Sequence, residues 1–153
     1  MTKLKEGDKA PGFTAKDQDG NTVSLADLQG KKVILYFYPQ DDTPTCTKEA
    51  CNFRDNYQSL LGKGFAVIGV SFDTEKSHQK FIKKYNLPFP LISDPDRKII
   101  EAYGVWGEKK LFGREYMGTL RTTFIINEKG VITHIIDKVK SGNASQQVLD
   151  LLQ

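Results

Sequence analysis

Two stretches of the chain are almost continuously apolar, and the segment between them has a helical repeat. Residues Val33–Tyr38 (VILYFY) and Phe65–Val70 have the pattern of strands that are buried on both faces of a sheet. Between them, Pro44–Leu61 carries apolar residues at three- and four-residue steps, which predicts an amphipathic helix. Strand, helix and strand together predict a βαβ unit.

The pattern continues after this unit with further helices and strands. The predicted segments are a helix over Glu75–Tyr85, a strand within Leu87–Ser93, a short helix over Arg97–Tyr103, strands over Arg121–Ile126 and Val131–Ile136, and a closing helix over Asn143–Leu152. A four-residue link, Asn127–Gly130, suits a β-hairpin between the last two strands. Turn signals within the first thirty residues predict another hairpin, which covers the core. The expected architecture is an α/β fold with a mixed central sheet flanked by helices.

Length and composition indicate one globular domain, which we expect to span residues 1–153. The chain is 39% hydrophobic and 27% charged, which is ordinary for a globular protein, and no repeat or linker divides it. Its 22 basic and 19 acidic residues form no long basic run, which argues against nucleic-acid binding. The start of the chain lacks a secretory signal, and no stretch is apolar enough to span a membrane. We therefore expect a cytoplasmic protein, although a mature organellar protein would look the same.

The first of the two cysteines lies where a buried strand gives way to a helix. Ligand and catalytic groups favour this end of the strands in an α/β sheet. Thr43 suits the N-cap position and Pro44 the first helical position, which places Cys46 in the first turn. The free N–H groups and the positive end of the helix dipole stabilise an anion there, so the setting favours a thiolate nucleophile. The alternative is that Cys46 is a small buried residue, four positions before Ala50 on the apolar face.

Cys51 follows on the same helix, roughly 140° further around its axis, and so faces away from the core. It shares this outer face with Asp55 and Gln58. An incidental surface thiol is one interpretation, but an exposed free cysteine is a liability unless its reactivity is used. We therefore favour a functional role for Cys51.

Other chemistries of cysteine fit the sequence less well. A Cys-x4-Cys pair on a helix points its sulfurs apart, and His78 and His134 lie among apolar neighbours, so we predict no metal site. A thioredoxin-type reductase needs Cys-x-x-Cys, and a cysteine hydrolase needs an oriented histidine base. What remains is a thiolate stabilised by a fixed cation. Arg121 opens a predicted strand and could supply it, unless it is simply a surface arginine at a strand end. Arg54, about 12 Å further along the helix, is poorly placed to reach Cys46.

These residues together resemble a known family. Pro39, Thr43 and Cys46 form the pattern PxxxTxxC, and Cys51 and Arg121 stand at the positions that accompany it. The longer stretches YFYPQDDTPTCTKEACNFRD and YGVWGEKK are similar to those of the bacterioferritin comigratory protein, or PrxQ, group of atypical two-cysteine peroxiredoxins. The similarity covers nearly the whole chain.

The resemblance implies a thioredoxin-like fold and a peroxidase that reduces hydrogen peroxide and organic hydroperoxides without a bound cofactor. In such an enzyme Cys46 becomes a sulfenic acid, Cys51 resolves it as an intramolecular disulfide, and thioredoxin reduces the disulfide. In an intact helix the two Cα atoms lie roughly 8.6 Å apart, whereas a disulfide tolerates at most about 7 Å. The bond therefore requires the start of the helix to open. We also expect a monomer.

The resemblance assigns roles to four further residues. Thr43 and Arg121 hold the peroxide oxygens and the thiolate, Pro39 shields the site from water, and Glu49 orients Arg121. One departure is Thr45, where many relatives carry glycine, and a β-branched residue is stiffer there. Two alternatives stay open: a peroxide-sensing protein on the same fold with incidental turnover, and a structural module with inert cysteines.

Overall fold

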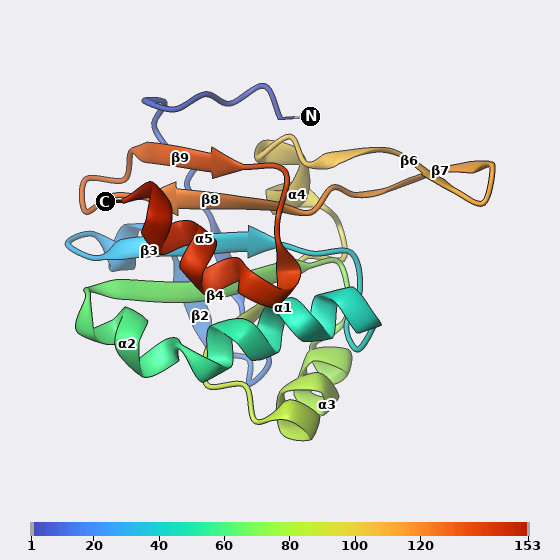
Figure 1. Ribbon diagram of the computed structural model, residues 1–153, viewed down its shortest axis with the longest axis horizontal. Coiled ribbons are helices and arrows are strands. Elements are labelled where there is room, and N and C mark those ends of the chain that lie inside the picture. The colour runs from blue at the N-terminus through green and yellow to red at the C-terminus, as the bar shows by residue number, and fades with distance from the viewer. Residues whose placement is uncertain (1, 153) are drawn as a thin grey trace.

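The computed structural model describes residues 2–152 and has a five-stranded sheet at its centre (Figure 1). In spatial order the strands are Leu91–Ser93 (β5), Phe65–Ser71 (β4), Lys32–Phe37 (β3), Thr122–Ile126 (β8) and Ile132–Ile136 (β9). β4 is parallel to both β3 and β5, whereas β8 is antiparallel to both β3 and β9. The predicted sheet, which mixes parallel βαβ crossovers with an antiparallel hairpin, is confirmed.

Helices cover both faces of this sheet. They are Pro44–Asp55 (α1), Tyr57–Gly62 (α2), Glu75–Tyr85 (α3), Lys98–Ala102 (α4) and Ala144–Leu151 (α5), with short 3₁₀ helices at Ala26–Leu28 and Ser141–Asn143. One apolar cluster packs α1, α2, α3 and α5 against the face that carries Tyr36. A second cluster packs α4 and the N-terminal segment against the face that carries Phe37. β3 alternates its side chains between the two clusters, which explains its unbroken apolar sequence. Among residues 2–152, no helix combines the length and the apolar character needed to cross a membrane.

The single helix predicted over residues 44–61 is wrong, because it breaks at Asn56 into α1 and α2. The Asn56 side-chain amide donates a hydrogen bond to the Asn52 carbonyl oxygen at 2.9 Å. Side-chain bonds of this kind compete with the backbone bonding of a continuous helix. The break lies beyond both cysteines, so the part of the helix that matters for the site is intact.

The strand predicted within Leu87–Ser93 is shorter than expected, since β5 begins only at Leu91. Pro88 and Pro90 have no N–H to donate to a neighbouring strand, which explains the late start. The other predicted helices and strands agree with the structure to within one residue at each end. The N-terminal hairpin is also confirmed, with Thr14–Lys16 (β1) antiparallel to Thr22–Ser24 (β2).

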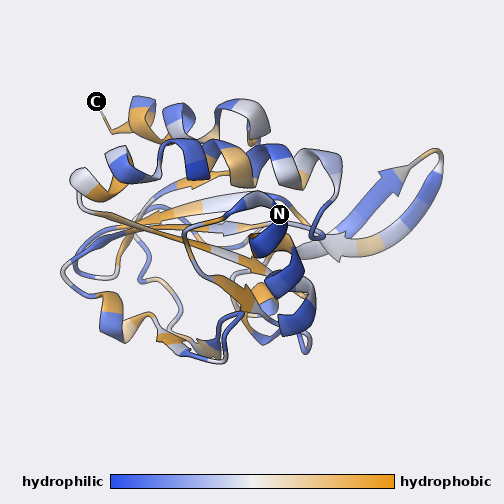
Figure 2. Ribbon diagram, turned by 90° about the horizontal axis from the view of Figure 1, so that it is seen from below, coloured by the Kyte–Doolittle hydropathy of each residue, from blue (hydrophilic) through white to orange (hydrophobic). Residues whose placement is uncertain are grey.

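Residues 104–120, to which the hydrophobic pattern assigns no element, contain a further hairpin that projects from the body of the protein (Figures 1 and 2). Trp106–Leu111 (β6) pairs antiparallel with Arg114–Thr119 (β7). The turn residues Phe112 and Gly113 have φ of 52° and 75°, the left-handed values that a two-residue hairpin turn requires. The outer part of β7 is exposed, and no apolar face repeats along it. The pattern that identifies half-buried strands is therefore missing here.

Candidate active site

Cys46 lies in the first turn of α1, as the sequence predicts. β3 ends at Phe37, and the loop that follows leads to Thr43 at the N-cap and Pro44 at the first helical position. The Cys46 thiol is free, and the residue is only 2% exposed, within the apolar cluster that also contains Ala50. Cys46 therefore lies both at a helix N-terminus and in a buried place, so each of the two sequence-based interpretations describes part of its position.

Thr43 occupies the N-cap, but its side chain does not cap the helix as expected. Its hydroxyl donates a hydrogen bond to the Gln40 carbonyl oxygen at 2.9 Å. Its own carbonyl oxygen accepts a bond from the Thr47 N–H at 2.8 Å. The turn before the helix therefore takes the hydroxyl hydrogen, which leaves the two lone pairs of the oxygen free to accept from a ligand. Pro39 is half-buried in the same loop, and no hydrogen bond within residues 2–152 joins Thr43 to Cys46.

Arg121 bridges Cys46 and Glu49. It lies immediately before β8, whose first residue, Thr122, pairs with Phe37 at the end of β3. This register places Arg121 beside the loop that leads into α1. Its Nη2 donates to Cys46 Sγ at 3.1 Å, and its Nη1 donates to Glu49 Oε1 at 2.7 Å. The structure thus brings together three of the residues that the sequence nominated.

Glu49 is fully buried, one helical turn after Cys46. Burial raises the pKa of Glu49 from 4.5 to about 7, against the opposing effect of Arg121. Burial also lowers the pKa of Arg121, but the charges of Cys46 and Glu49 outweigh this effect and raise it. Arg121 is therefore charged at neutral pH, while Glu49 titrates in that range. Glu49 Oε2 has no partner among the described residues.

Lys109 brings a second cation to the same region, and the sequence reasoning missed it. It lies on β6, and its Nζ donates to the Thr119 carbonyl oxygen at 3.0 Å. Burial and the charge of Arg121 lower the pKa of Lys109, and the charge of Cys46 raises it. Lys109 and Arg121 also line one cavity of about 820 Å³. Only the pairing of β6 with β7 could have placed this lysine, and that hairpin had no hydrophobic signal.

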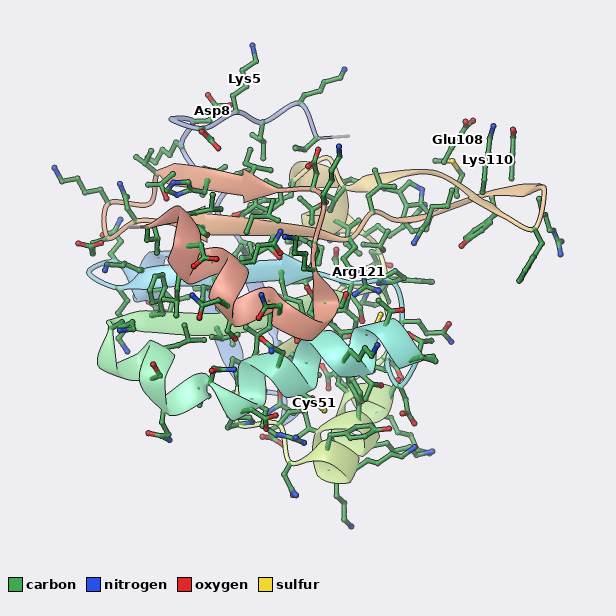
Figure 3. The ribbon with its side chains drawn as sticks, viewed as in Figure 1. Lys5, Asp8, Cys51, Glu108, Lys110 and Arg121 are labelled. Atoms are coloured by element: carbon green, nitrogen blue, oxygen red, sulfur yellow. The ribbon has the colours of Figure 1, made fainter. Side chains whose placement is uncertain are left out.

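Cys51 is not brought together with Cys46. Its thiol is free and half-buried, so the expectation of a fully outward-facing thiol is only partly correct. Figure 3 shows Cys51 on the side of α1 that faces α3, with Arg121 on the other side of the helix. On the Cys51 side, Arg54 Nη1 donates to the Tyr85 carbonyl oxygen at 2.7 Å and so joins α1 to α3.

The two histidines lie away from this site. His134 is half-buried on β9, and His78 is fully buried on α3, so both are core or boundary residues as predicted. Ligand atoms of Asp41, Asp73 and His78 lie within 4.8 Å of one another. These ligand atoms already take part in hydrogen bonds among the three residues and with Ser71 and Ser77.

Fold and site together define a class: a thioredoxin-like α/β protein with a buried cysteine at a helix N-terminus, held against an arginine–glutamate pair. Residues 6–135 match the AhpC/TSA family. A putative peroxiredoxin Bcp of Coxiella burnetii is 55% identical over 137 residues, which are 90% of this chain and 91% of that protein. The chain therefore belongs to the AhpC/TSA family.

Solved structures agree with this assignment. A cysteine-to-serine mutant of Xylella fastidiosa PrxQ superposes with a TM-score of 0.92 at 29% identity, covering 99% of this chain and 97% of that one. The bacterioferritin comigratory protein of Xanthomonas campestris superposes with a TM-score of 0.85 at 32% identity, covering 92% and 89%. The resemblance to the Bcp or PrxQ group of peroxiredoxins and the thioredoxin-like fold are both confirmed.

Proposed function

We propose that this chain is a peroxidase that reduces hydrogen peroxide and organic hydroperoxides through Cys46, with Cys51 and thioredoxin completing the cycle. The observation that carries the proposal is the 3.1 Å contact between Arg121 Nη2 and Cys46 Sγ, with Glu49 holding the other nitrogen. Relatives named as peroxiredoxins support a peroxidase, and the alkyl peroxide reduction activity of the Xanthomonas campestris protein supports organic substrates. A single domain over residues 1–153, a monomer and a cytoplasmic location are part of the same proposal.

In the first step, the Cys46 thiolate attacks one oxygen of the hydroperoxide. An S–O bond forms and the O–O bond breaks, and the departing oxygen takes up a proton and leaves as water or alcohol. Arg121 and the unpaired N–H groups of the first turn stabilise the charge that moves onto that oxygen. The Thr43 oxygen accepts from the substrate, Pro39 limits access of water, and Glu49 keeps Arg121 in place.

In the second step, the Cys51 thiol attacks the sulfenic sulfur of Cys46 and releases water as the disulfide forms. The two thiols of thioredoxin then reduce this disulfide. Because α1 is continuous from Pro44 to Asp55, both cysteines lie within one intact helix. Their Cα separation of roughly 8.6 Å exceeds the limit of about 7 Å for a disulfide, so the start of α1 must open first.

Asn52 gives this opening a natural boundary. Its Oδ1 accepts from the Ser145 N–H at 2.8 Å, and its Nδ2 donates to the Gly142 carbonyl oxygen at 3.1 Å. These bonds tie α1, directly after Cys51, to the 3₁₀ helix Ser141–Asn143 and to the start of α5. The two helical turns before Asn52 can therefore unwind while the remainder of α1 stays on the sheet.

Peroxide consumption coupled to thioredoxin and thioredoxin reductase tests the catalytic cycle. We expect turnover by the wild-type protein and none by Cys46→Ser. Turnover also separates a peroxidase from the peroxide-sensing alternative, for which a single oxidation would suffice. Continued consumption by Cys46→Ser would show that the nucleophile is elsewhere.

Amide hydrogen exchange on the reduced and oxidised proteins tests the opening of α1. We expect protection between Thr43 and Cys51 to be lost on oxidation and protection beyond Asn52 to be retained. Mass spectrometry of the oxidised protein should show an intramolecular Cys46–Cys51 bond. Equal protection in both states, with the bond present, would contradict the proposed cycle.

A further inference from the structure

The loop between β3 and α1 is attached to α3 through two adjacent aspartates. Asp42 accepts hydrogen bonds from Lys84 Nζ and from the Tyr85 hydroxyl, both at 2.8 Å. The side chains of this pair are exposed, 57% for Lys84 and 42% for Asp42, so solvent screens the attraction. Asp41 is buried instead, and its Oδ1 accepts from the Tyr38 hydroxyl at 2.6 Å. The firmer of the two attachments is therefore the one through Asp41.

His78 is the fully buried partner of Asp41 on α3. The ring is fully buried, with Nδ1 2.7 Å from Asp41 Oδ2 and Nε2 3.0 Å from the Ile92 carbonyl oxygen. A carbonyl oxygen can only accept, so Nε2 carries a hydrogen. Nδ1 is then the ring atom that bonds to the Asp41 carboxylate. The Ser77 hydroxyl donates to the same Oδ2 at 2.7 Å. This is a satisfied, charge-assisted contact in a buried place.

The backbone of Asp41 is held as well. Its N–H donates to Asp73 Oδ2 at 2.8 Å, and the Ser71 hydroxyl donates to the same oxygen at 2.8 Å. The groups that face the Asp41–His78 pair thus come from the segments that follow β3 and β4, from the end of β4, from α3 and from β5. Asp41 stands two residues before the N-cap Thr43 and five before Cys46.

We propose that His78 is a positioning residue for Cys46, acting through Asp41 on the loop that leads into α1. In the peroxide-reactive form, the pair holds this loop on α3 and so keeps the first turn of α1 folded. Without His78, Asp41 loses its fully buried partner on α3, and the loop and first turns open more readily. His78 therefore sets the balance between the reaction with peroxide, which needs the folded form, and disulfide formation, which needs the open one. This balance rests on the function proposed above.

The test compares His78→Leu and His78→Asn with Lys84→Met, which removes the exposed attachment on the same helix. Hydrogen exchange of the reduced proteins over residues 39–46 is the first readout. We expect exchange in His78→Leu to rise by about tenfold or more, the effect of losing a buried charge-assisted bond. His78→Asn, whose amide can still donate to Asp41, should lie between, and Lys84→Met should stay within about threefold of wild type.

Rapid mixing with hydrogen peroxide gives a second readout that mere loss of stability does not produce. In His78→Leu, the reaction of Cys46 with peroxide should slow while disulfide formation from the sulfenic acid speeds up. If His78→Leu does not fold, Asp41→Asn removes the same shared charge and carries the same two expectations. Disulfide formation that slows, or stays unchanged, would overturn the proposal.

Two further results would also contradict the proposed positioning role of His78. Exchange in His78→Leu no faster than in Lys84→Met would mean that Asp41 needs no partner on α3. A rise spread evenly over the sheet would mean that His78 supports the whole fold and not the loop. If the wild-type protein forms no Cys46–Cys51 bond, the proposed cycle fails on its own, and the exchange measurement still decides whether His78 holds the loop.

Discussion

Replacing Glu49 by glutamine tests the electrostatics of the site most directly. Glutamine keeps the shape of the side chain and can still accept from Arg121, but it cannot titrate. Moving the pKa of Glu49 from 4.5 to about 7 corresponds to about 3.4 kcal/mol, at about 1.36 kcal/mol per pKa unit. Burial is the main cause, and Arg121 already offsets part of it.

The direction in which the free energy of unfolding changes with pH follows from proton binding. A raised pKa means that the folded state binds this proton more tightly than the unfolded state does. Stability from Glu49 is therefore fully present below about pH 4.5 and is lost as the pH rises through about 7. Between pH 5 and pH 8 the wild-type protein should lose about 2.5 kcal/mol of unfolding free energy on this account, and Glu49→Gln should not.

Urea unfolding of the reduced proteins at pH 5 and pH 8 measures this difference. Both proteins share every other titrating group, so the contributions of groups that are not coupled to Glu49 cancel when the two pH dependences are compared. Glu108→Gln, which changes an exposed carboxylate on β6, is the matched control and should follow the wild-type protein. The same pH dependence in Glu49→Gln and in wild type would refute the reasoning, because Glu49 would then titrate as an ordinary exposed carboxylate.

Three other changes test the roles of the residues around the thiol. Arg121→Met should slow the reaction with peroxide by about 10²–10³-fold in stopped-flow measurements, the usual cost of losing a positioned donor. The double variant Arg121→Met/Glu49→Gln, which leaves no unpaired buried carboxylate, should be slowed as well. A rate within a few-fold of wild type would remove Arg121 from the mechanism. Cys51→Ser should react once with peroxide at the wild-type rate and then accumulate a sulfenic acid that a sulfenic-specific reagent traps; sustained thioredoxin-dependent turnover would show that another thiol resolves it. Lys109→Met should slow the reaction by about fivefold, the equivalent of about 1 kcal/mol of lost charge stabilisation, whereas Lys110→Met, on the next position of β6, should leave the rate unchanged. Equal rates for the two lysine variants would mean that Lys109 does not act on the thiolate.

Some features of this protein follow from the sequence alone, because they depend on residues that are close together in the chain. The run Val33–Tyr38 is buried on both faces of the sheet, and an unbroken apolar hexapeptide can hardly be accommodated otherwise. Pro44 can begin a helix but cannot continue one, so it places Cys46 in a first turn. The motif that carries the family resemblance occupies the same short stretch.

Only the tertiary structure decides which distant groups meet the thiol. Arg121 reaches Cys46 across 75 positions of sequence, and it does so because β8 pairs with β3 in one register. A shift of one residue would turn its side chain to the other face of the sheet. The buried environment that raises the pKa of Glu49 is likewise a product of packing, since a glutamate on a helix is ordinarily exposed. Lys109 and His78 depend on tertiary structure even more, because no local pattern shows that one hairpin turns back to the site or that one ring lies between Asp41 and a strand carbonyl. Periodicity along the chain encodes which side chains are buried, whereas the identity of their partners depends on how the elements pack together.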